Sequence, residues 1–191
     1  MILAGPNGAG KSTHARYIVE GLHGIERFIN PDTIASGLAG FARTSADREA
    51  GRIALDAIAE AITQRVDFAF ETTLAGRRWP RLLDKLERAG FEVLLHYLWI
   101  SRAELCVERV RTRVAMGGHD VPELDVRRRY LASLRNLTEL FMPRVTAWQV
   151  LDASIAGHLA PVAAGGVRRP LRVEKPEAWH QVARAAASQR T

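Results

Sequence analysis

Short apolar runs alternate along the chain with amphipathic stretches, and turn residues separate the two kinds of segment. An apolar run bounded by turn residues is typical of a buried strand, whereas apolar residues at every third or fourth position indicate a helix. Strands that alternate with helices form parallel sheets with helices on both faces. The pattern therefore predicts an α/β fold with a mostly parallel central sheet of about five strands.

The predicted elements fall at definite places in the sequence. The strands cover Ile2–Ala4, Arg27–Ile29, Phe68–Phe70, Phe91–Ile100 and Trp148–Leu151. The helices cover Lys11–Leu22, Asp47–Arg65, Leu82–Arg88, Arg102–Met116 and Pro122–Phe141. A tight turn at Gly117, Gly118 and His119 joins the last two helices.

The pattern weakens after Asp152. Gly165, Gly166 and Pro170 interrupt it, a short strand is expected near Leu171–Val173, and Pro176 is suited to begin a terminal helix that reaches Arg184. A chain of 191 residues has the length of one domain. We expect a single domain over residues 1–191, with a core of about 1–155 and a C-terminal extension, 156–191, packed on that core.

Composition excludes several classes of protein. Hydrophobic residues make up 47% and charged residues 25%, which are globular proportions and not those of a disordered or fibrous chain. Cys106 is the only cysteine, so no internal disulfide can form, and no apolar run is long enough to span a bilayer. Glycine and proline after Ala4 argue against a signal peptide. We expect a cytoplasmic protein without membrane contact.

The formal charge is +6, and every basic residue except Lys11, Lys85 and Lys175 is arginine. A basic surface attracts nucleic acid, but the arginines are scattered over the whole sequence and form no single stripe. Arginine also binds small phosphorylated ligands, because its planar guanidinium donates two parallel hydrogen bonds to phosphate oxygens. A nucleic-acid partner is therefore the less favoured interpretation.

A phosphate-binding loop occupies the first turn after the first strand. It matches the P-loop pattern at every fixed position and comprises Gly5, Pro6, Asn7, Gly8, Ala9, Gly10, Lys11 and Ser12, with Thr13 next to it. Lys11 would reach the terminal phosphates of ATP or GTP, and Ser12 would coordinate Mg²⁺. The glycines and Asp32 also resemble a dinucleotide-binding pattern, but Lys11, Ser12 and Thr13 favour a nucleoside triphosphate.

Polar residues at the ends of later strands indicate a second substrate. The sequence contains neither a guanine-recognition motif nor the Asp-Glu strand end of motor ATPases. Asp32 follows the second strand and is suited to accept a proton from an attacking hydroxyl, although an aspartate there could instead cap a helix. Glu71, Thr72 and Thr73 follow the third strand and could bind an acceptor, although either threonine could instead cap a turn.

Arginines gather on the two helices around the Gly117–His119 turn. Arg109 and Arg113 lie on one face of the first helix, and Arg127, Arg128 and Arg129 begin the second. We predict a lid in which Arg113, Arg128 and Arg129 contact the phosphates and the remaining arginines face solvent, because successive residues of a helix cannot all point one way. His119 is interpreted as a structural hydrogen-bond donor and Cys106 as a core residue.

Four segments together resemble the zeta toxin-like kinases, in particular their short chromosomal branch. They are GPNGAGKST from Gly5, FINPDTIA from Phe28, FAFETTLAGR from Phe68, and RVRTRVAMGGHDVPELDVRRRYLASLRNL from Arg109. The resemblance implies a P-loop kinase that uses ATP or GTP with Mg²⁺ and phosphorylates a small hydroxyl acceptor, UDP-N-acetylglucosamine in the best-known members. It also implies a toxin of a toxin–antitoxin system, with a cognate antitoxin as partner.

The resemblance also suggests residue roles. Lys11 and Ser12 match the nucleotide loop, Asp32 the base, Glu71 an acidic residue at the acceptor sugar, and Arg113 the first of two phosphate-binding arginines. The second family arginine has no counterpart in the stretch 118–122, so one of Arg127 to Arg129 would replace it. Two other functions stay open: a polynucleotide kinase or nucleic-acid-binding NTPase, and a nucleotide-gated interaction protein with weak hydrolysis.

Overall fold

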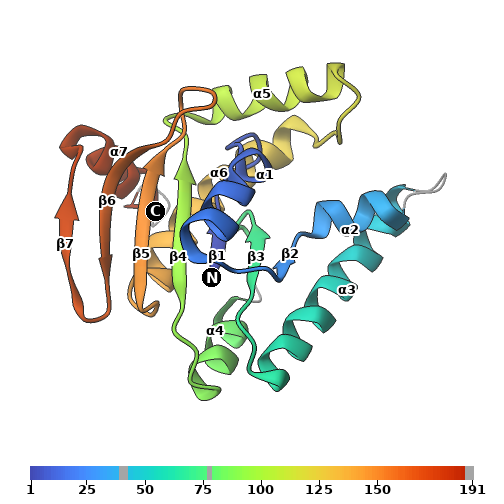
Figure 1. Ribbon diagram of the computed structural model, residues 1–191. Coiled ribbons are helices and arrows are strands. Elements are labelled where there is room, and N and C mark those ends of the chain that lie inside the picture. Colours follow the sequence, from blue (N-terminus) through green and yellow to red (C-terminus); the bar gives the residue numbers. More distant parts are fainter. Residues whose placement is uncertain (39–42, 77–78, 188–191) are drawn as a thin grey trace.

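The sheet has seven strands, in a computed structural model that describes residues 1–38, 43–76 and 79–187 (Figure 1). Five of them are parallel and lie side by side in the order β2 (Phe28–Ile29), β3 (Ala69–Thr72), β1 (Ile2–Ala4), β4 (Leu94–Trp99) and β5 (Ala147–Asp152). Two antiparallel strands, β6 (Ala160–Gly166) and β7 (Arg169–Val173), extend the sheet beyond β5. The predicted α/β class with a mostly parallel sheet is confirmed.

Strand β1, the first strand of the sequence, lies in the interior of the sheet. Its three residues, Ile2, Leu3 and Ala4, are fully buried, because β3 and β4 pair with it on either side and helices cover both faces. A parallel strand buried on both faces needs a continuous apolar run, which is what the sequence supplies there. The phosphate loop follows the carboxyl end of β1. It therefore lies between the ends of β3 and β4, away from the two outer strands.

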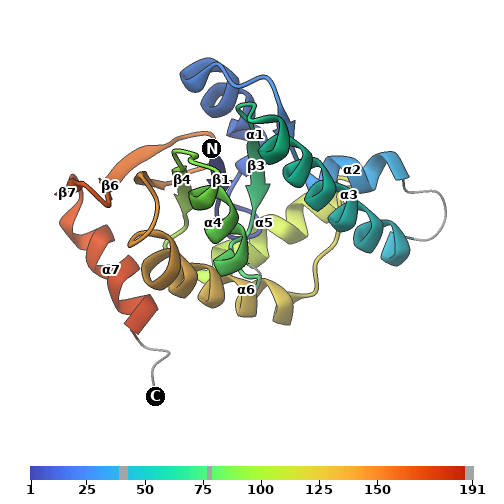
Figure 2. The ribbon, with the colours of Figure 1, turned by 90° about the horizontal axis from the view of Figure 1, so that it is seen from below.

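The helices form two layers (Figure 2). They are α1 (Lys11–Ala15), which continues as the π-helix η1 (Arg16–Leu22), α2 (Pro31–Leu38), α3 (Arg43–Gln64), α4 (Trp79–Arg88), α5 (Ala103–Ala115), α6 (Glu123–Asn136), which continues as the π-helix η2 (Leu137–Phe141), and α7 (Pro176–Ala187). Helices α4, α6 and α7 cover one face of the sheet, and α1 with η1 covers β1 and β4 on the other. Within the described residues, no helix has the length and apolarity to cross a membrane.

Three elements differ most from the sequence-based prediction, and α4 and β4 differ by up to three residues at their ends. Helix α2 was not predicted, α3 begins at Arg43 instead of Asp47, and strand β6 was not predicted. Strand β6 is rich in small residues. Glycine is needed at position 165 because a Cβ atom there would lie 2.7 Å from Cζ2 of Trp148. The glycine that suggested a break in the pattern is therefore the residue that lets β6 approach β5.

We propose that residues 1–191 fold as one domain, because the C-terminal extension is continuous with the core. Strand β6 pairs with β5, and Trp179 of α7 stacks on Trp148 of β5 with ring centroids 5.6 Å apart. Val182, also on α7, is completely buried. These contacts make the extension part of the same hydrophobic core as β1 and β4.

Replacing Trp179 with alanine tests this proposal. We expect Trp179→Ala to lower the free energy of unfolding by roughly 2 kcal/mol, somewhat less than a fully buried tryptophan, because Trp179 is only partly buried. Chemical denaturation of the purified protein measures the change. His180→Ala, an exposed neighbour on the same helix, is the control and should leave stability nearly unchanged. Equal stabilities of the two variants would contradict the proposal.

Candidate active site

The phosphate loop connects β1 to α1 and is pressed against β4. Gly5 has a φ of 150°, and a Cβ atom there would lie 2.5 Å from the carbonyl oxygen of Leu98. Only glycine fits this position, so the loop backbone can run close to the sheet. The backbone N–H of Gly5 donates to the carbonyl of Thr72, which fixes the loop against the end of β3 as well.

Lys11, at the first position of α1, folds back over the loop. Its Nζ donates to the carbonyl of Pro6 at 3.1 Å and lies 3.8 Å from Oε1 of Glu71. Burial lowers the pKa of Lys11, and the carboxylates of Glu71 and Asp32 partly counteract this. A buried ammonium group with only one close carboxylate is well placed to gain a second anionic partner, such as a phosphate.

Glu71 joins the phosphate loop to two strand ends. Its Oε2 accepts hydrogen bonds from Oγ of Ser12 at 3.1 Å and from Nδ2 of Asn30 at 3.0 Å. Burial raises the pKa of Glu71, whereas the nearby Lys11 lowers it. The structure thus places Glu71 directly beside the predicted Mg²⁺ ligand Ser12.

Asp32 lies in the first turn of α2, and Asn30 caps that helix. Oδ1 of Asn30 accepts from the backbone N–H of Asp32 at 2.8 Å and from that of Thr33 at 3.4 Å. The capping role considered for Asp32 therefore belongs to Asn30. The carboxylate of Asp32 is exposed and lines the cavity at the phosphate loop.

Thr72 fulfils the alternative role considered for it. Its Oγ1 accepts from the backbone N–H of Leu74 at 3.0 Å, and Leu74 has a positive φ of 57°. The hydroxyl therefore supports the turn that follows β3. Thr72 and Thr73 both still line the cavity.

Of the three arginines predicted to contact the phosphates, Arg113 and Arg129 line the cavity at the phosphate loop and Arg128 does not. Arg113 donates to the carbonyl of His119 at 2.6 Å, and its Nε is buried without a hydrogen-bond partner among the described residues. Arg128 instead pairs with Asp125 on the exposed side of α6, at 2.8 Å. Arg127 pairs with Glu104 and Glu123, and so joins the two lid helices instead of facing the phosphates.

Apart from Arg127 and Arg128, the side chains described above lie around one cavity of about 600 Å³ at the carboxyl ends of β1, β2 and β3. Its lining includes the predicted residues Asn7, Gly8, Gly10, Lys11, Ser12, Thr13, Asp32, Glu71, Thr72, Thr73, Arg113 and Arg129. Gly5, Pro6 and Ala9 belong to the loop without lining the cavity. Ligands of open α/β sheets bind at this edge, so the cavity lies where a substrate site is expected.

Two residues that the sequence analysis did not assign to the site are part of it. Asn30 fixes both Glu71 and the start of α2, and its place just before Pro31 and Asp32 was a detectable capping signal. Arg109 donates to the carbonyls of Gly8, Ala153 and Ser154, at 3.3, 2.8 and 2.6 Å. No sequence pattern distinguishes such an arginine from a solvent-exposed one.

Arg109 is expected to hold the phosphate loop in place. Arg109→Lys would remove donors to three carbonyls, so we expect the KM for the nucleotide to rise by about tenfold with a smaller effect on kcat. Steady-state kinetics with varied nucleotide concentration measures both. Arg135→Lys, an exposed arginine of α6, is the matched control. An unchanged KM in the Arg109 variant would exclude this role.

The donor set around Ser12 fits a magnesium ion. Mg²⁺ prefers oxygen ligands and is usually held by one or two side chains together with substrate phosphates. Ser12 and Glu71 supply such oxygens 3.1 Å apart, and Asp32 lines the same cavity. No group of three or more His, Cys, Asp or Glu side chains that could hold a metal ion occurs in the described part of the chain.

Comparison with known proteins places the chain in a family. Residues 1–137 match the AAA domain family, and this segment contains the phosphate loop, Asp32, Glu71 and Arg113. The chain belongs to the AAA domain family. An uncharacterized protein of Haemophilus influenzae is 34% identical over 130 residues, which is 68% of this chain and 91% of that protein.

Solved structures share the fold. A chain of the AvrRxo1-ORF1:AvrRxo1-ORF2 complex matches with a TM-score of 0.76 at 16% identity, over 100% of this chain but 65% of that one. The complex solved with ATP matches equally well. The PezAT chromosomal toxin–antitoxin system of Streptococcus pneumoniae matches with a TM-score of 0.63 at 15% identity, over 98% of this chain and 85% of that one. The resemblance to zeta toxin-like P-loop kinases is confirmed at the level of the fold, because this AAA domain chain has a P-loop kinase-like fold.

Proposed function

We propose that this protein is a Mg²⁺-dependent kinase that transfers the γ-phosphate of ATP or GTP to a hydroxyl group of a small acceptor. The observation that carries the proposal is the convergence of Lys11, Ser12, Glu71 and Asp32 on one cavity. A nucleotide site alone would not need the exposed carboxylate of Asp32 in the same cavity. That carboxylate supports a second, hydroxyl-bearing substrate.

In the proposed reaction, the acceptor oxygen attacks the γ-phosphorus and the bond to the β-phosphate oxygen breaks. Asp32 takes the proton that the acceptor hydroxyl loses. Lys11, Arg113 and Arg129 bind the phosphate oxygens, on which negative charge is redistributed during transfer. Arg128, paired with Asp125 outside the cavity, has no part in this proposal.

Ser12 and Glu71 would hold the magnesium ion, Ser12 directly and Glu71 as a ligand or as its hydrogen-bond partner. Bound Mg²⁺ neutralises charge on the β- and γ-phosphates. Because Glu71 also accepts from Asn30, the carboxylate is fixed before any ligand binds. We propose that Glu71 serves the metal and phosphate side of the cavity, with Thr73 and Asp32 nearer to the acceptor.

The acceptor is proposed to be a nucleotide sugar, with UDP-N-acetylglucosamine as the first candidate. The resemblance to zeta toxin-like kinases supports it. The cavity wall is partly apolar and contains Ile58, Phe70 and Trp79, a surface on which a sugar or base can pack. We further propose that the protein acts as the toxin of a toxin–antitoxin pair, since its structural neighbours are solved as AvrRxo1-ORF1:AvrRxo1-ORF2 and PezAT complexes.

The decisive experiment is transfer of labelled γ-phosphate. The protein is incubated with labelled ATP or GTP, Mg²⁺ and either UDP-N-acetylglucosamine or a small-molecule extract, and the labelled product is identified by mass. We expect a phosphorylated small molecule that does not form when Mg²⁺ is chelated. Transfer of the label only to the 5′-hydroxyl of an oligonucleotide would favour the polynucleotide kinase alternative, which the formal charge of +6 supports. Hydrolysis without any labelled acceptor would contradict the kinase proposal.

A further inference from the structure

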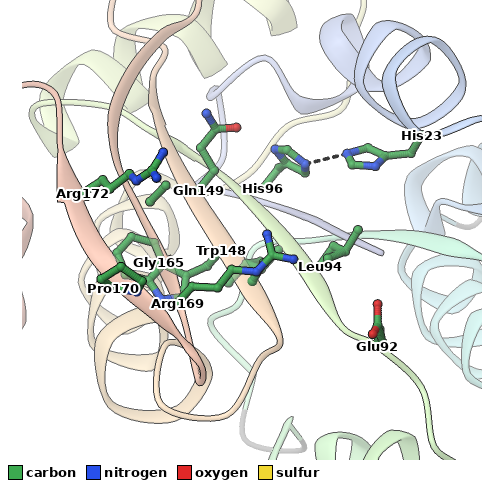
Figure 3. A pocket seen from close by; sticks show the side chains of 13 residues that line it. His23, Glu92, Leu94, His96, Trp148, Gln149, Gly165, Arg169, Pro170 and Arg172 are labelled. Atoms are coloured by element: carbon green, nitrogen blue, oxygen red, sulfur yellow. Dashed lines mark hydrogen bonds between the residues drawn. The ribbon is translucent and has the colours of Figure 1, made fainter.

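A second cavity lies on the face of the sheet that α1 and η1 leave open. It has a volume of about 570 Å³, extends over β4, β5, β6 and β7, and shares no lining residue with the phosphate-loop cavity (Figure 3). Its apolar floor is formed by small and aliphatic residues such as Leu94, Ala147 and Ala164. None of the reaction steps proposed above uses this cavity.

A histidine pair forms one wall. Nε2 of His23, which follows η1, and Nε2 of His96 on β4 lie 2.8 Å apart, so one ring donates a hydrogen bond to the other (Figure 3). Burial and the neighbouring His23 lower the pKa of His96 to about 4, so His96 is neutral at physiological pH. Nδ1 of His96 is buried, and the side chain of Gln149, which also lines the cavity, acts on the same ring and partly offsets the lowering of the His96 pKa.

Two arginines form the opposite wall. Arg169 and Arg172 extend from the edge strand β7 over the face of the sheet, Arg172 toward Gln149 and Arg169 toward Leu94 (Figure 3). Both are exposed, and no ion pair or hydrogen bond to another described residue holds either guanidinium. Glu92 is the only acidic residue of the lining, and Figure 3 shows it at the far end, beyond Leu94. The cavity is therefore positively charged and its charge is unbalanced.

We propose that this second cavity binds a small phosphorylated ligand. Two guanidinium groups offer paired donors that match phosphate oxygens, and the amide of Gln149 offers another. The floor carries no charge and can receive the carbon part of the ligand. A volume of 570 Å³ is within the range of cavities that bind small molecules. The proposal does not depend on the kinase function, because no residue is shared between the two cavities.

The fold gives a reason for this site to exist. In a doubly wound fold, helices normally cover both faces of the sheet, and the antiparallel strands β6 and β7 extend this one beyond the helices on the η1 side. An uncovered sheet face is usually lined by side chains that water can solvate. Here two cations stand on one side and a neutral histidine pair on the other, with Gln149 between them and the single carboxylate, Glu92, at the far end, an arrangement that favours an anion.

Binding of inorganic pyrophosphate tests the proposal. Lys11→Ala is introduced first, so that the phosphate loop contributes little to the measured affinity. In that background, Arg169→Gln/Arg172→Gln is compared with Arg135→Gln/Arg168→Gln, which removes the same two charges from exposed positions outside the cavity. Calorimetry at constant ionic strength gives the affinities. We expect the first pair to weaken pyrophosphate binding by about tenfold or more, and the second pair to change it by less than about twofold.

A second measurement ties the binding to the cavity. Imidazole nitrogen resonances of His23 and His96 should shift on addition of pyrophosphate to the Lys11→Ala protein, and should not shift in the Arg169→Gln/Arg172→Gln variant. Equal weakening by both arginine pairs would reveal only non-specific charge attraction and would overturn the proposal. It would also be overturned if pyrophosphate does not bind while a single-stranded oligonucleotide binds and depends on Arg169 and Arg172, because the surface would then serve nucleic acid.

Discussion

Replacing Asp32 with asparagine is expected to lower kcat for phosphoryl transfer by about 10²–10⁴-fold, the usual contribution of a general base. The affinity for the nucleotide should change far less, because the exposed side chain of Asp32 acts on Lys11 only through its charge and forms no hydrogen bond or ion pair with the phosphate loop among the described residues. Asparagine has nearly the same shape but cannot accept the proton. Initial rates at saturating nucleotide, together with a direct measurement of nucleotide binding, separate the two effects.

Asp56→Asn is the matched control for this experiment. Asp56 is an exposed aspartate of α3 that pairs with Arg52, so its replacement should leave kcat unchanged. If Asp32→Asn transfers phosphate at a nearly normal rate while it still binds nucleotide, Asp32 is not the base. The kinase proposal itself would survive that result, since it rests on the whole cavity.

Replacing Arg113 with alanine should lower kcat by about 10²–10³-fold and raise the nucleotide KM far less, as for other groups that stabilise charge in the transition state. Nε of Arg113 is a buried donor to which no described residue offers an acceptor, and a phosphate oxygen would satisfy it. Arg113→Lys should recover little activity, because an ammonium group lacks the planar pair of donors.

The arginines of α6 provide the comparison for Arg113. Arg129→Ala should cause a clear loss, because Arg129 lines the cavity, whereas Arg128→Ala should have nearly no effect, because Arg128 pairs with Asp125. These positions are adjacent on one helix, so both variants should fold equally well. Equal and mild losses for Arg113, Arg128 and Arg129 would indicate a solvated surface and would contradict the lid.

Strong periodic features of the sequence predicted most of the fold. The buried run at Ile2–Ala4, the phosphate loop and the helix that follows it all have the predicted places. Helix α2 escaped prediction because it is short and has no buried residues, so no apolar row marks it. Strand β6 escaped because small residues and glycine, which fit under Trp148, resemble a loop when only their sequence is known.

The candidate site was predictable wherever chemistry follows from a local motif. Lys11, Ser12, Asp32 and Glu71 meet because parallel strands bring their carboxyl ends to one edge of the sheet. The choice among Arg127, Arg128 and Arg129 was not predictable, since it depends on where Asp125 and Glu104 lie in space. Arg109 was missed for the same reason: its partners are backbone carbonyls from distant loops.

The two outer strands of the sheet also bear on self-association. Unpaired strand edges can recruit another chain, and aggregation often begins there. One edge, β2, has only two residues, and the other, β7, carries Pro170, which lacks a backbone donor, together with Arg169 and Arg172. Loss of the last strand would expose β6, an uncharged edge of small residues. The same arginines that form the wall of the second cavity therefore also place positive charge on this sheet edge, which disfavours pairing with another chain.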